Sequence, residues 1–364
     1  MNRRAMLVGG TAVVLAGAGA ASYSYLQMGS VTGYDTAIAA GRGALPGNPD
    51  FRDLIRFATL AANSHNTQAW RFRSSDGRIE VLPDFSRHTP AVDPDQHHLF
   101  VSLGCAAENL ALASSARGRP GELRFDGAKD GAAVFEFVDG SSRPSDLFDA
   151  IPHRQSTRAE YDGRTVSTAD LEILASAAAL PGVDVKLITD RPTIDRVRDL
   201  VMAGNNAQMM DSAFVKELKS WLRFNPRQAL RSGDGLYSGA SGSPILPTWL
   251  GPHMFDLFFQ AKSENEKYAR QLKTSPGVAV FVAAKADREH WILAGQACQR
   301  FALQATALGL KHAFINQPVE VADLRPELAA LIGVPGRRPD LVMRYGYGPT
   351  LPGSPRRPVE DVIV

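Results

Sequence analysis

The sequence has little cysteine and almost no net charge. Only Cys105 and Cys298 occur among its 364 residues. They are far apart in the chain, so no zinc site made from paired cysteines is indicated. Each lies in an apolar, helix-like run, and we interpret both as small buried hydrophobic residues. A disulfide between them is possible but not signalled. The formal net charge of +2 is too small to argue for a nucleic-acid partner.

Several motifs of catalysis and binding are also missing. There is no Gly-x-Gly-x-x-Gly between a strand and a helix, no P-loop and no nucleophile elbow. His97 and His98 follow Asp93, but adjacent histidines point to different faces and no third ligand at zinc spacing completes the set, so we predict no metal site. No catalytic acid or base stands out by pattern. Hydrophobic residues make up 44% of the chain and charged residues 21%, which predicts a sizeable core.

The N-terminus has the pattern of a targeting signal. Arg3 and Arg4 precede a Gly/Ala-rich apolar stretch from about Val8 to Ala21, with small-residue cleavage sites near its end. This pattern resembles a twin-arginine export signal. We therefore predict a signal or membrane anchor over residues 1–30 and a periplasmic or other extracytoplasmic location. A disordered basic tail is the alternative.

Three pairs of segments indicate an internal repeat. Gly104–Gly118 and Gly295–Gly309 match in their small residues, and two further pairs follow the same order: 53–61 with 170–178, and 133–138 with 341–345. The first pair is offset by 295 − 104 = 191 and the second by 170 − 53 = 117, so the second copy carries 191 − 117 = 74 extra residues between about 183 and 290. Chance similarity of Ala-rich helices is the alternative. Two copies of one α+β unit can imitate a homodimer, with a cofactor between them.

The extra segment allows two interpretations. Residues 193–220 are helix-like, residues 231–247 form a Gly/Ser-containing loop, and aromatic residues follow at Trp249, Phe255, Phe258 and Phe259. Such a segment could form a lid over a pocket. It could equally be an additional helix pair whose aromatic residues face the core.

A neutral polar loop separates a helix-like run (51–62) from a strand containing Trp70 and Phe72. It contains Ser64, Asn66, Thr67 and Gln68, which offer hydrogen-bond donors and acceptors without charge. Such a loop suits a flat ring rich in heteroatoms. Turn and N-cap chemistry is the alternative, because Asn and Ser are favoured there.

Two clusters contain closely spaced arginines. The first includes Arg154, Gln155, Ser156 and Arg158, and the second contains Arg356 and Arg357 in a Pro-rich segment. A guanidinium group offers a fixed fork of donors that suits phosphate or the carbonyl edge of a ring. Solvent-exposed charge is the alternative for each cluster.

Together these motifs resemble the nitroreductase family. Residues 61–72 resemble its Ala-Pro-Ser-x-x-Asn-x-Gln-Pro-Trp segment, with Asn63 and Ala69 in place of the usual prolines. Residues 154–158 resemble its opening Arg-Arg-Ser-x-Arg motif, and the Gly-Tyr, Arg-Arg-Pro and Val-Glu-Asp-Val elements resemble its closing segment. More narrowly, the motif order resembles the Acg-like branch, in which two nitroreductase-type halves are fused. The resemblance covers most of residues 50–364.

The resemblance implies an α+β, nitroreductase-like fold with two pseudo-symmetric halves, each with an antiparallel sheet flanked by helices. The first half would span 31–150 and the second 151–364, with the lid-like insertion at about 183–290. It also implies FMN as cofactor. Carried over by position, the residues that contact the flavin or its phosphate would be Arg154, Gln155, Ser156, Arg158, Ser64, Asn66, Gln68, Arg356 and Arg357.

The implied activity is that of an exported FMN-dependent oxidoreductase. It would work by ping-pong reduction of an electron-poor acceptor such as a nitro compound or quinone. The electron donor would be NAD(P)H, a quinol or a protein, and the chain would be a monomeric pseudo-dimer or a homodimer. The flavin would carry the redox chemistry, which agrees with the missing acid/base pattern. The alternatives are a flavin-sequestering or storage protein without turnover, and a degenerate protein that has lost FMN.

Overall fold

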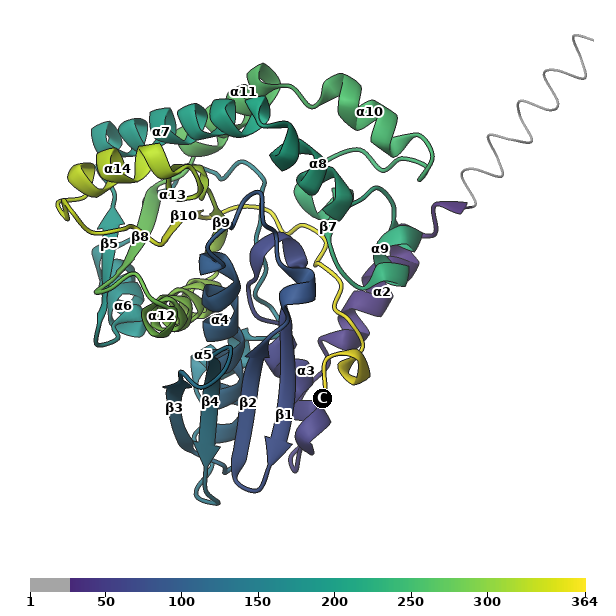
Figure 1. Cartoon of the computed structure of the whole chain (residues 1–364), viewed down its shortest axis with the longest axis vertical. Helices are drawn as coiled ribbons and strands as arrows, with labels where there is room; N and C mark the ends of the chain where they lie inside the picture. The colour runs from purple at the N-terminus through teal and green to yellow at the C-terminus, as the bar shows by residue number, and fades with distance from the viewer. Residues whose placement is uncertain (1–26) are drawn as a thin grey trace, which may run out of the picture.

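The computed structural model describes residues 27–364 (Figure 1). Most of the predicted export signal therefore lies outside the described residues. Within residues 27–364, no helix combines the length and the apolar character that a membrane span requires.

Two four-stranded sheets organise the chain. The first contains β1 (Trp70–Ser75), β2 (Arg78–Pro83), β3 (Gly121–Asp126) and β4 (Ala132–Phe137) in the order β1-β2-β4-β3. The second contains β5 (Val183–Ile188), β8 (Gly277–Ala283), β9 (Lys311–Phe314) and β10 (Leu341–Gly346) in the order β5-β8-β10-β9. All neighbouring strands are antiparallel. Both sheets thus share one strand order, and the predicted α+β class is confirmed.

The helices around the sheets also correspond. Helix α3 (Phe51–Thr59) precedes β1, and α6 (Thr168–Ala178) precedes β5. The long helices α4 (His97–Ser115) and α12 (Arg288–Ala307) each connect the second strand of a sheet to its third. The segments that the sequence pairs therefore occupy equivalent places in the two sheets.

Helices α4 and α12 cross at two glycines. A Cβ atom on Gly104 would lie 2.0 Å from the carbonyl oxygen of Ile292, and one on Gly295 would lie 2.0 Å from that of Val101. The contacts are reciprocal, because 295 − 104 = 191 and 292 − 101 = 191. Only glycine permits this approach of the two backbones.

Polar pairs beside the crossing repeat the same reciprocity. Glu108 binds Arg300 at 2.9 Å, and Asn109 accepts a 2.7 Å hydrogen bond from Gln299. Here too 299 − 108 = 191 and 300 − 109 = 191. A contact in which residue i meets j and j meets i is the signature of a two-fold interface.

The two sheets differ in how they are covered. All residues of β8 are buried, with Val278, Val280 and Val282 in one core and Ala279 and Phe281 in another. Helices therefore cover both faces of the second sheet, which explains the continuous apolar run of β8. Strand β1 alternates buried and exposed residues at its start, as expected where one face meets solvent.

An insertion separates β5 from β8. Residues 189–276 lie between these strands, whereas β1 and β2 are joined by residues 76–77. The predicted interval of 183–290 includes β5 and β8, which belong to the sheet itself. The insertion contains α7 (Arg191–Met210), α8 (Ser212–Trp221), β6 (Leu222–Arg223), α9 (Pro226–Ser232), β7 (Leu236–Tyr237), α10 (Gly251–Phe258) and α11 (Ala261–Lys273).

The other elements are helix α2, three short helices and the C-terminal segment. Helix α2 (Val31–Gly41) packs on the insertion through a small core formed by Tyr34, Ala229, Tyr237 and Ala240. Short helices α5 (Asp146–Ala150), α13 (Gln317–Glu320) and α14 (Arg325–Leu331) complete the fold. The C-terminus runs along the free edge of β1, where Phe72 exchanges backbone hydrogen bonds with residues 362 and 364 (Figure 1). This covers an otherwise open sheet edge.

Candidate functional site

A cavity of about 650 Å³ lies between the insertion and the loop that follows α3. Its size is typical of small-molecule sites. One wall comes from residues 62–65 and the α4 residues His98, Ser102 and Cys105. The opposite wall comes from α7, α8, α10 and α11 of the insertion. The predicted lid is thus a wall of the cavity.

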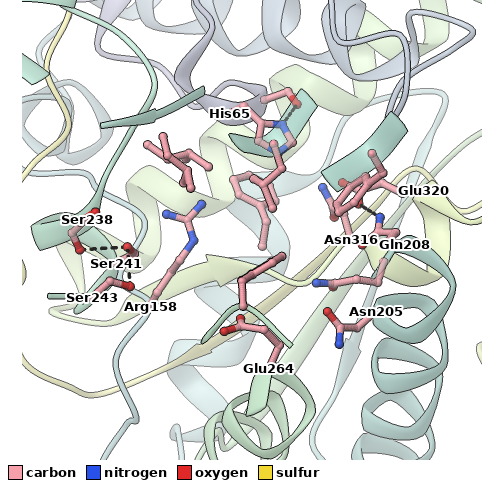
Figure 2. Close-up of a pocket in the computed structure, with 18 of the residues that line it drawn as sticks. His65, Arg158, Asn205, Gln208, Ser238, Ser241, Ser243, Glu264, Asn316 and Glu320 are labelled. Atoms are coloured by element: carbon pink, nitrogen blue, oxygen red, sulfur yellow. Dashed lines mark hydrogen bonds between the residues drawn. The ribbon is translucent and has the colours of Figure 1, made fainter. Parts of the chain in front are cut away.

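The lining of the cavity has an apolar part and a polar part. The insertion supplies the apolar residues Phe214, Phe224, Met254, Phe255, Phe258 and Phe259. Arg158 projects into the middle, with the serines at 238, 241 and 243 on one side and Asn205, Gln208, Asn316 and Glu320 on the other (Figure 2). A mainly apolar cavity with a few converging polar groups is the usual form of a ligand site.

The loop after α3 has an unusual backbone. His65, Asn66 and Gln68 have φ angles of 47°, 53° and 53°. Left-handed backbone is uncommon for residues other than glycine, and a group of three within four positions is typical of a strained functional loop. Ser64 and His65 of this loop line the cavity.

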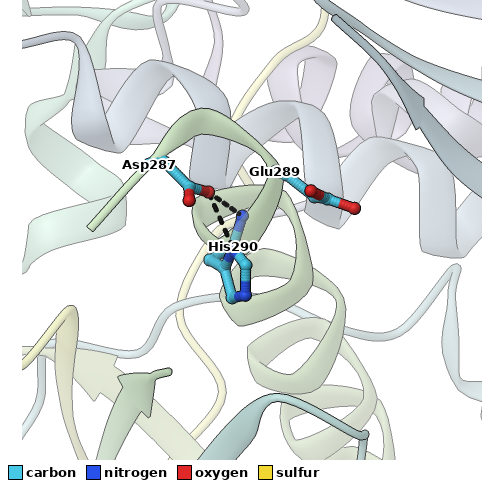
Figure 3. Close-up of side chains that lie close together, drawn as sticks. All are labelled: Asp287, Glu289 and His290. Carbon is cyan, nitrogen blue, oxygen red and sulfur yellow. Dashed lines mark hydrogen bonds and ion pairs between the residues drawn. The ribbon is translucent and has the colours of Figure 1, made fainter. Parts of the chain in front are cut away.

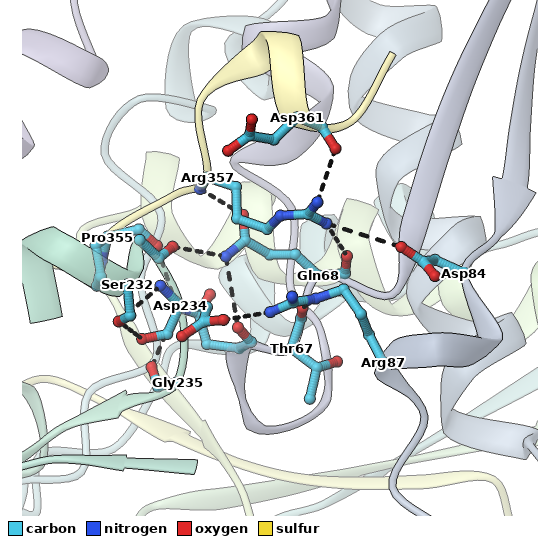
Figure 4. Close-up of polar contacts among 12 residues, drawn as sticks. Thr67, Gln68, Asp84, Arg87, Ser232, Asp234, Gly235, Pro355, Arg357 and Asp361 are labelled. Atoms are coloured by element: carbon cyan, nitrogen blue, oxygen red, sulfur yellow. Dashed lines mark hydrogen bonds and ion pairs between the residues drawn. The ribbon is translucent and has the colours of Figure 1, made fainter. Parts of the chain in front are cut away.

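Two buried amides hold the strained loop in place. Gln68 donates from Nε2 to the carbonyl of Gly233 at 2.8 Å and accepts from the backbone N–H of Arg357 at 2.9 Å (Figure 4). Asn66 donates from Nδ2 to the carbonyls of Gly235 and Pro355, both at 3.1 Å. The loop is therefore fastened to the insertion and to the C-terminal segment. Neither amide lines the cavity, so they position Ser64 and His65 there.

Removing the Gln68 amide should destabilise the protein. Gln68→Ala leaves a buried carbonyl and a buried N–H without partners, which we expect to lower the free energy of unfolding by about 2–4 kcal/mol. Urea unfolding of the flavin-free protein measures the effect. Gln155→Ala is the matched control, since Gln155 makes one 2.8 Å bond to Leu351 and its loss should cost about 1 kcal/mol. Equal losses for the two variants would contradict the assigned role.

The C-terminal arginines are bound to backbone carbonyls. Arg356 donates to the carbonyls of residues 59, 60 and 61 at the end of α3. Arg357 donates to the carbonyls of Gln68 and Asp361. Cations favour the C-terminal end of a helix, so Arg356 acts here as a cap of α3.

Arg154 has donors without partners. Its side chain is buried, with 3% exposure, and only Nη2 is satisfied, by the carbonyl of Leu60 at 3.0 Å. Within residues 27–364, its Nε and Nη1 have no hydrogen-bond partner, and neither have Thr157 Oγ1 and both ring nitrogens of His312. Burial, followed by the nearby charge of Arg42, lowers the pKa of Arg154 to about 10. No carboxylate among residues 27–364 pairs with it, so this cluster of buried donors suits an anion.

The Arg154 side chain lies next to the cavity. The Arg154 guanidinium is close enough to the Cys105 thiol for the two to interact electrostatically, and Cys105 lines the cavity. Both cysteines are buried, as predicted, and no disulfide joins them. The carbonyl of Leu60, which Arg154 binds, lies two residues before the cavity residue Ala62.

The other residues of the first arginine cluster have different places. Arg158 lines the cavity, and no hydrogen bond or ion pair joins its side chain to any residue in the 27–364 range. Ser156 forms an isolated β-bridge with His312 of β9. The structure thus brings Ser64 and Arg158 into one cavity with Arg154 beside it, while Asn66, Gln68, Gln155, Arg356 and Arg357 are bonded within the protein.

Sequence reasoning missed two groups of residues. Buried Arg344 donates to the carbonyls of Thr157 at 3.3 Å and Ala159 at 2.8 Å, and so positions the backbone on both sides of Arg158. In the cavity wall, His98 lies 3.6 Å from Glu320, which accepts a 2.6 Å bond from Gln208. No local motif marks these contacts, because their partners are distant in the chain.

Two cavity histidines should make stability depend on pH. Burial lowers the pKa of His65 to about 4 and of His98 to about 3, with nearby Arg158 and His97 adding to the respective shifts. Below about pH 6.5 these two histidines are protonated in the unfolded chain but stay neutral in the folded protein. The free energy of unfolding should therefore fall as pH drops from about 6.5 to 4, by up to about 1.4 kcal/mol per pH unit for each histidine.

Urea unfolding between about pH 7 and pH 5 measures this dependence. The double variant His65→Asn/His98→Asn should make the slope shallower, and the slope that remains comes from His97 and His312, whose pKa values burial also lowers. Asparagine tolerates the left-handed backbone at position 65. His153→Asn, at an exposed position, should leave the slope unchanged. A slope that is the same in the double variant and in the original protein would contradict the burial argument.

One group of side chains has the arrangement of metal ligands. Ligand atoms of Asp287, Glu289 and His290 lie within 4.8 Å of one another (Figure 3). Asp287 is the N-cap of α12 and accepts hydrogen bonds from the backbone and ring of His290 at 3.0 and 2.7 Å. Helix capping accounts for this arrangement.

In sequence, the chain is similar to two proteins of Mycobacterium tuberculosis (strain ATCC 25618 / H37Rv). It is 26% identical over 348 residues to "Putative NAD(P)H nitroreductase Rv3131", with 90% of this chain and 96% of that protein covered. It is 23% identical over 339 residues to "Putative NAD(P)H nitroreductase acg", with 86% and 94% covered. Both relatives match this chain over most of its length, and both carry the name of a nitroreductase. No protein-family model matches the chain.

Solved nitroreductases match this chain only loosely. A nitroreductase with bound FMN from Desulfitobacterium hafniense is 15% identical, covers 61% of this chain and 98% of its own, and has a TM-score of 0.37. The FMN-dependent nitroreductase NfnB from Mycobacterium smegmatis, in complex with NADPH, is 14% identical, covers 56% and 87%, and also has a TM-score of 0.37. Similarity at this level supports no conclusion about the site.

Proposed function

We propose that this protein is an FMN-dependent oxidoreductase of the nitroreductase type. The observation that carries the proposal is the buried guanidinium of Arg154, whose Nε and Nη1 have no partner. A buried donor without an acceptor is costly, and a phosphate would satisfy both nitrogens at once. The cavity next to it has the size and the mainly apolar lining that a flavin ring requires.

The chain's own residues would divide the work of binding. Arg154, with Thr157 and His312 beside it, would hold the phosphate. Arg158 would donate to the carbonyl edge of the ring, and Ser64 would contact the cofactor from the other wall. Gln68 and Asn66 would act through the loop that they fasten. When bound, FMN supplies the hydride and electron chemistry that no side chain in this cavity offers.

The insertion would select the acceptor. Phe255 and Phe259 stack on each other with ring centroids 4.3 Å apart, and both line the cavity. Aromatic side chains favour planar, apolar partners. Nitroaromatic compounds and quinones have this form, and the relatives' names include NAD(P)H as donor. We therefore propose ping-pong turnover between NAD(P)H and such an acceptor.

Two further parts of the proposal concern the whole chain. The reciprocal contacts of α4 and α12, together with the shared strand order, support two fused nitroreductase-type halves. The Arg3-Arg4 pair and the apolar stretch after it support twin-arginine export to an extracytoplasmic location.

Turnover by purified protein tests the function. We expect a yellow protein whose flavin is bleached by NADPH under anaerobic conditions and is reoxidised by a nitroaromatic compound or a quinone. Flavin that only dithionite bleaches, with no acceptor turned over, would support flavin storage instead. A colourless preparation that stays colourless after FMN is added would contradict both functions.

A further inference from the structure

We propose that helix α10 and the segment before it form a surface that docks on a lipid bilayer. This surface is defined by residues 242–260 and is called the α10 surface below. The proposal concerns where the protein works, and it holds whether or not the function proposed above is correct.

The α10 surface exposes large apolar side chains. Trp249, Leu257 and Phe258 are 65%, 60% and 61% exposed. The expectation that the aromatic residues of the insertion face the core is therefore wrong for Trp249 and Phe258. Clustered apolar exposure of this kind marks a contact surface, and Trp, Phe and Leu are the residues that insert at the membrane–water interface.

Charge is nearly absent from this surface. Residues 242–260 contain one histidine, His253, and one Asp, Glu, Lys or Arg side chain, Asp256, in a chain with 21% charged residues. Its carboxylate is bound by Lys219 Nζ at 2.6 Å. The cost of bringing the α10 surface to a bilayer is thereby reduced, because no unpaired charge would have to leave water.

The position of α10 favours a membrane as its partner. In Figure 1 the helix lies at the outer edge of the insertion, apart from both sheets. The apolar N-terminal stretch, Val8 to Ala21, precedes Gln27, and Arg227 of α9 in the same insertion binds the side chain of Gln27 and the carbonyl of Met28. The chain thus joins its apolar N-terminal segment to the part of the fold that carries the α10 surface.

The same helix borders the cavity. Met254, Phe255 and Phe258 line it, and Phe258 is also among the exposed residues. A bilayer at the α10 surface would therefore lie next to the cavity wall. An apolar, lipid-soluble substrate could then pass from the membrane to the cavity without crossing water.

Fluorescence quenching by brominated lipid tests the docking. The full chain is mixed with vesicles of phosphatidylcholine and phosphatidylglycerol in which part of the phosphatidylcholine carries brominated chains. We expect quenching of tryptophan emission that Trp249→Phe lowers strongly. Trp70 and Trp291 are buried, and Trp221 is half-buried with the guanidinium groups of Arg87 and Arg223 over its ring. The difference between the two proteins reports on position 249 itself, whatever the N-terminal segment does.

Two variants make the test specific. Leu257→Ser/Phe258→Ser should lower the Trp249 quenching at a given lipid concentration about tenfold or more, since two large apolar side chains no longer enter the bilayer. Val138→Ser is the matched control, since Val138 is 70% exposed and directly follows β4 in the sequence. Strand β4 lies far from α10 in Figure 1. It should leave the quenching unchanged.

Three results would overturn the proposal. The first is vesicle-bound protein without quenching at Trp249, and the second is the absence of any vesicle binding. The third is a concentration-dependent dimer in analytical ultracentrifugation that Leu257→Ser/Phe258→Ser abolishes, since the α10 surface would then bind a second copy of the chain. None of these measurements uses flavin, so failure here is distinct from failure of the proposed enzyme activity.

Discussion

Arg154→Leu should weaken FMN binding while making the flavin-free protein more stable. The variant loses the charge-assisted hydrogen bonds to phosphate, which should reduce affinity about 10- to 150-fold. In the flavin-free protein, however, it removes a buried guanidinium whose Nε and Nη1 have no partner. We expect the free energy of unfolding to rise by about 1–2 kcal/mol. Flavin titration and urea unfolding measure the two quantities.

The opposite signs make this test selective. The protein should lose stability when an arginine with a purely structural role is removed. We expect this for Arg344, whose Nη2 donates to the carbonyls of Thr157 and Ala159 and whose Nη1 donates to the Ser275 hydroxyl. Arg52→Leu controls for the loss of one positive charge, because Arg52 is exposed and pairs with Glu360 at the surface. An Arg154→Leu protein with unchanged FMN affinity would remove the main support for the phosphate site.

Gly104→Ala should be among the most destabilising single substitutions in the chain. Its Cβ would lie 2.0 Å from the carbonyl oxygen of Ile292, far closer than atoms can approach, so α4 and α12 would have to move apart. Overpacking of this kind costs about 1–3 kcal/mol where side chains can adjust, and here the obstacle is backbone. We expect a loss of about 3 kcal/mol or more in urea unfolding.

Because the contact is reciprocal, a second variant tests the same prediction. Gly295→Ala meets the carbonyl of Val101 at the same 2.0 Å and should cost about as much as Gly104→Ala. Gly41→Ala in α2 is the matched control, since a Cβ there meets nothing within 4 Å and alanine favours helix. If Gly104→Ala lost less than about 1 kcal/mol, the close crossing of the two helices would be incorrect.

The repeat could be predicted because close helix crossings require small residues at fixed spacing. Glycines at 104 and 295 start both helix-like segments, and the structure places them at the crossing itself. The order of the strands in the sheets and the register of their pairing could not be predicted from the sequence. The exact limits of the insertion also required the structure, because the apolar run of β8 could equally belong to a buried helix.

The roles of the loop amides could not be read from the sequence. Ser, Asn and Gln at positions 64, 66 and 68 define which groups are offered, but not what they meet. The partners of Asn66 and Gln68 come from residues 233–235 and 355–357, far away in the chain. The same holds for Arg154, whose unpaired donors become visible only once every neighbouring acceptor is placed.

Titration of the flavin-free protein with FMN and with riboflavin tests the central claim most directly. The two ligands share the ring and ribityl chain and differ in the phosphate that Arg154 is proposed to hold. We predict that FMN binds at least about 100-fold more tightly than riboflavin. Equal affinities for the two ligands, or no binding of either, would contradict the account.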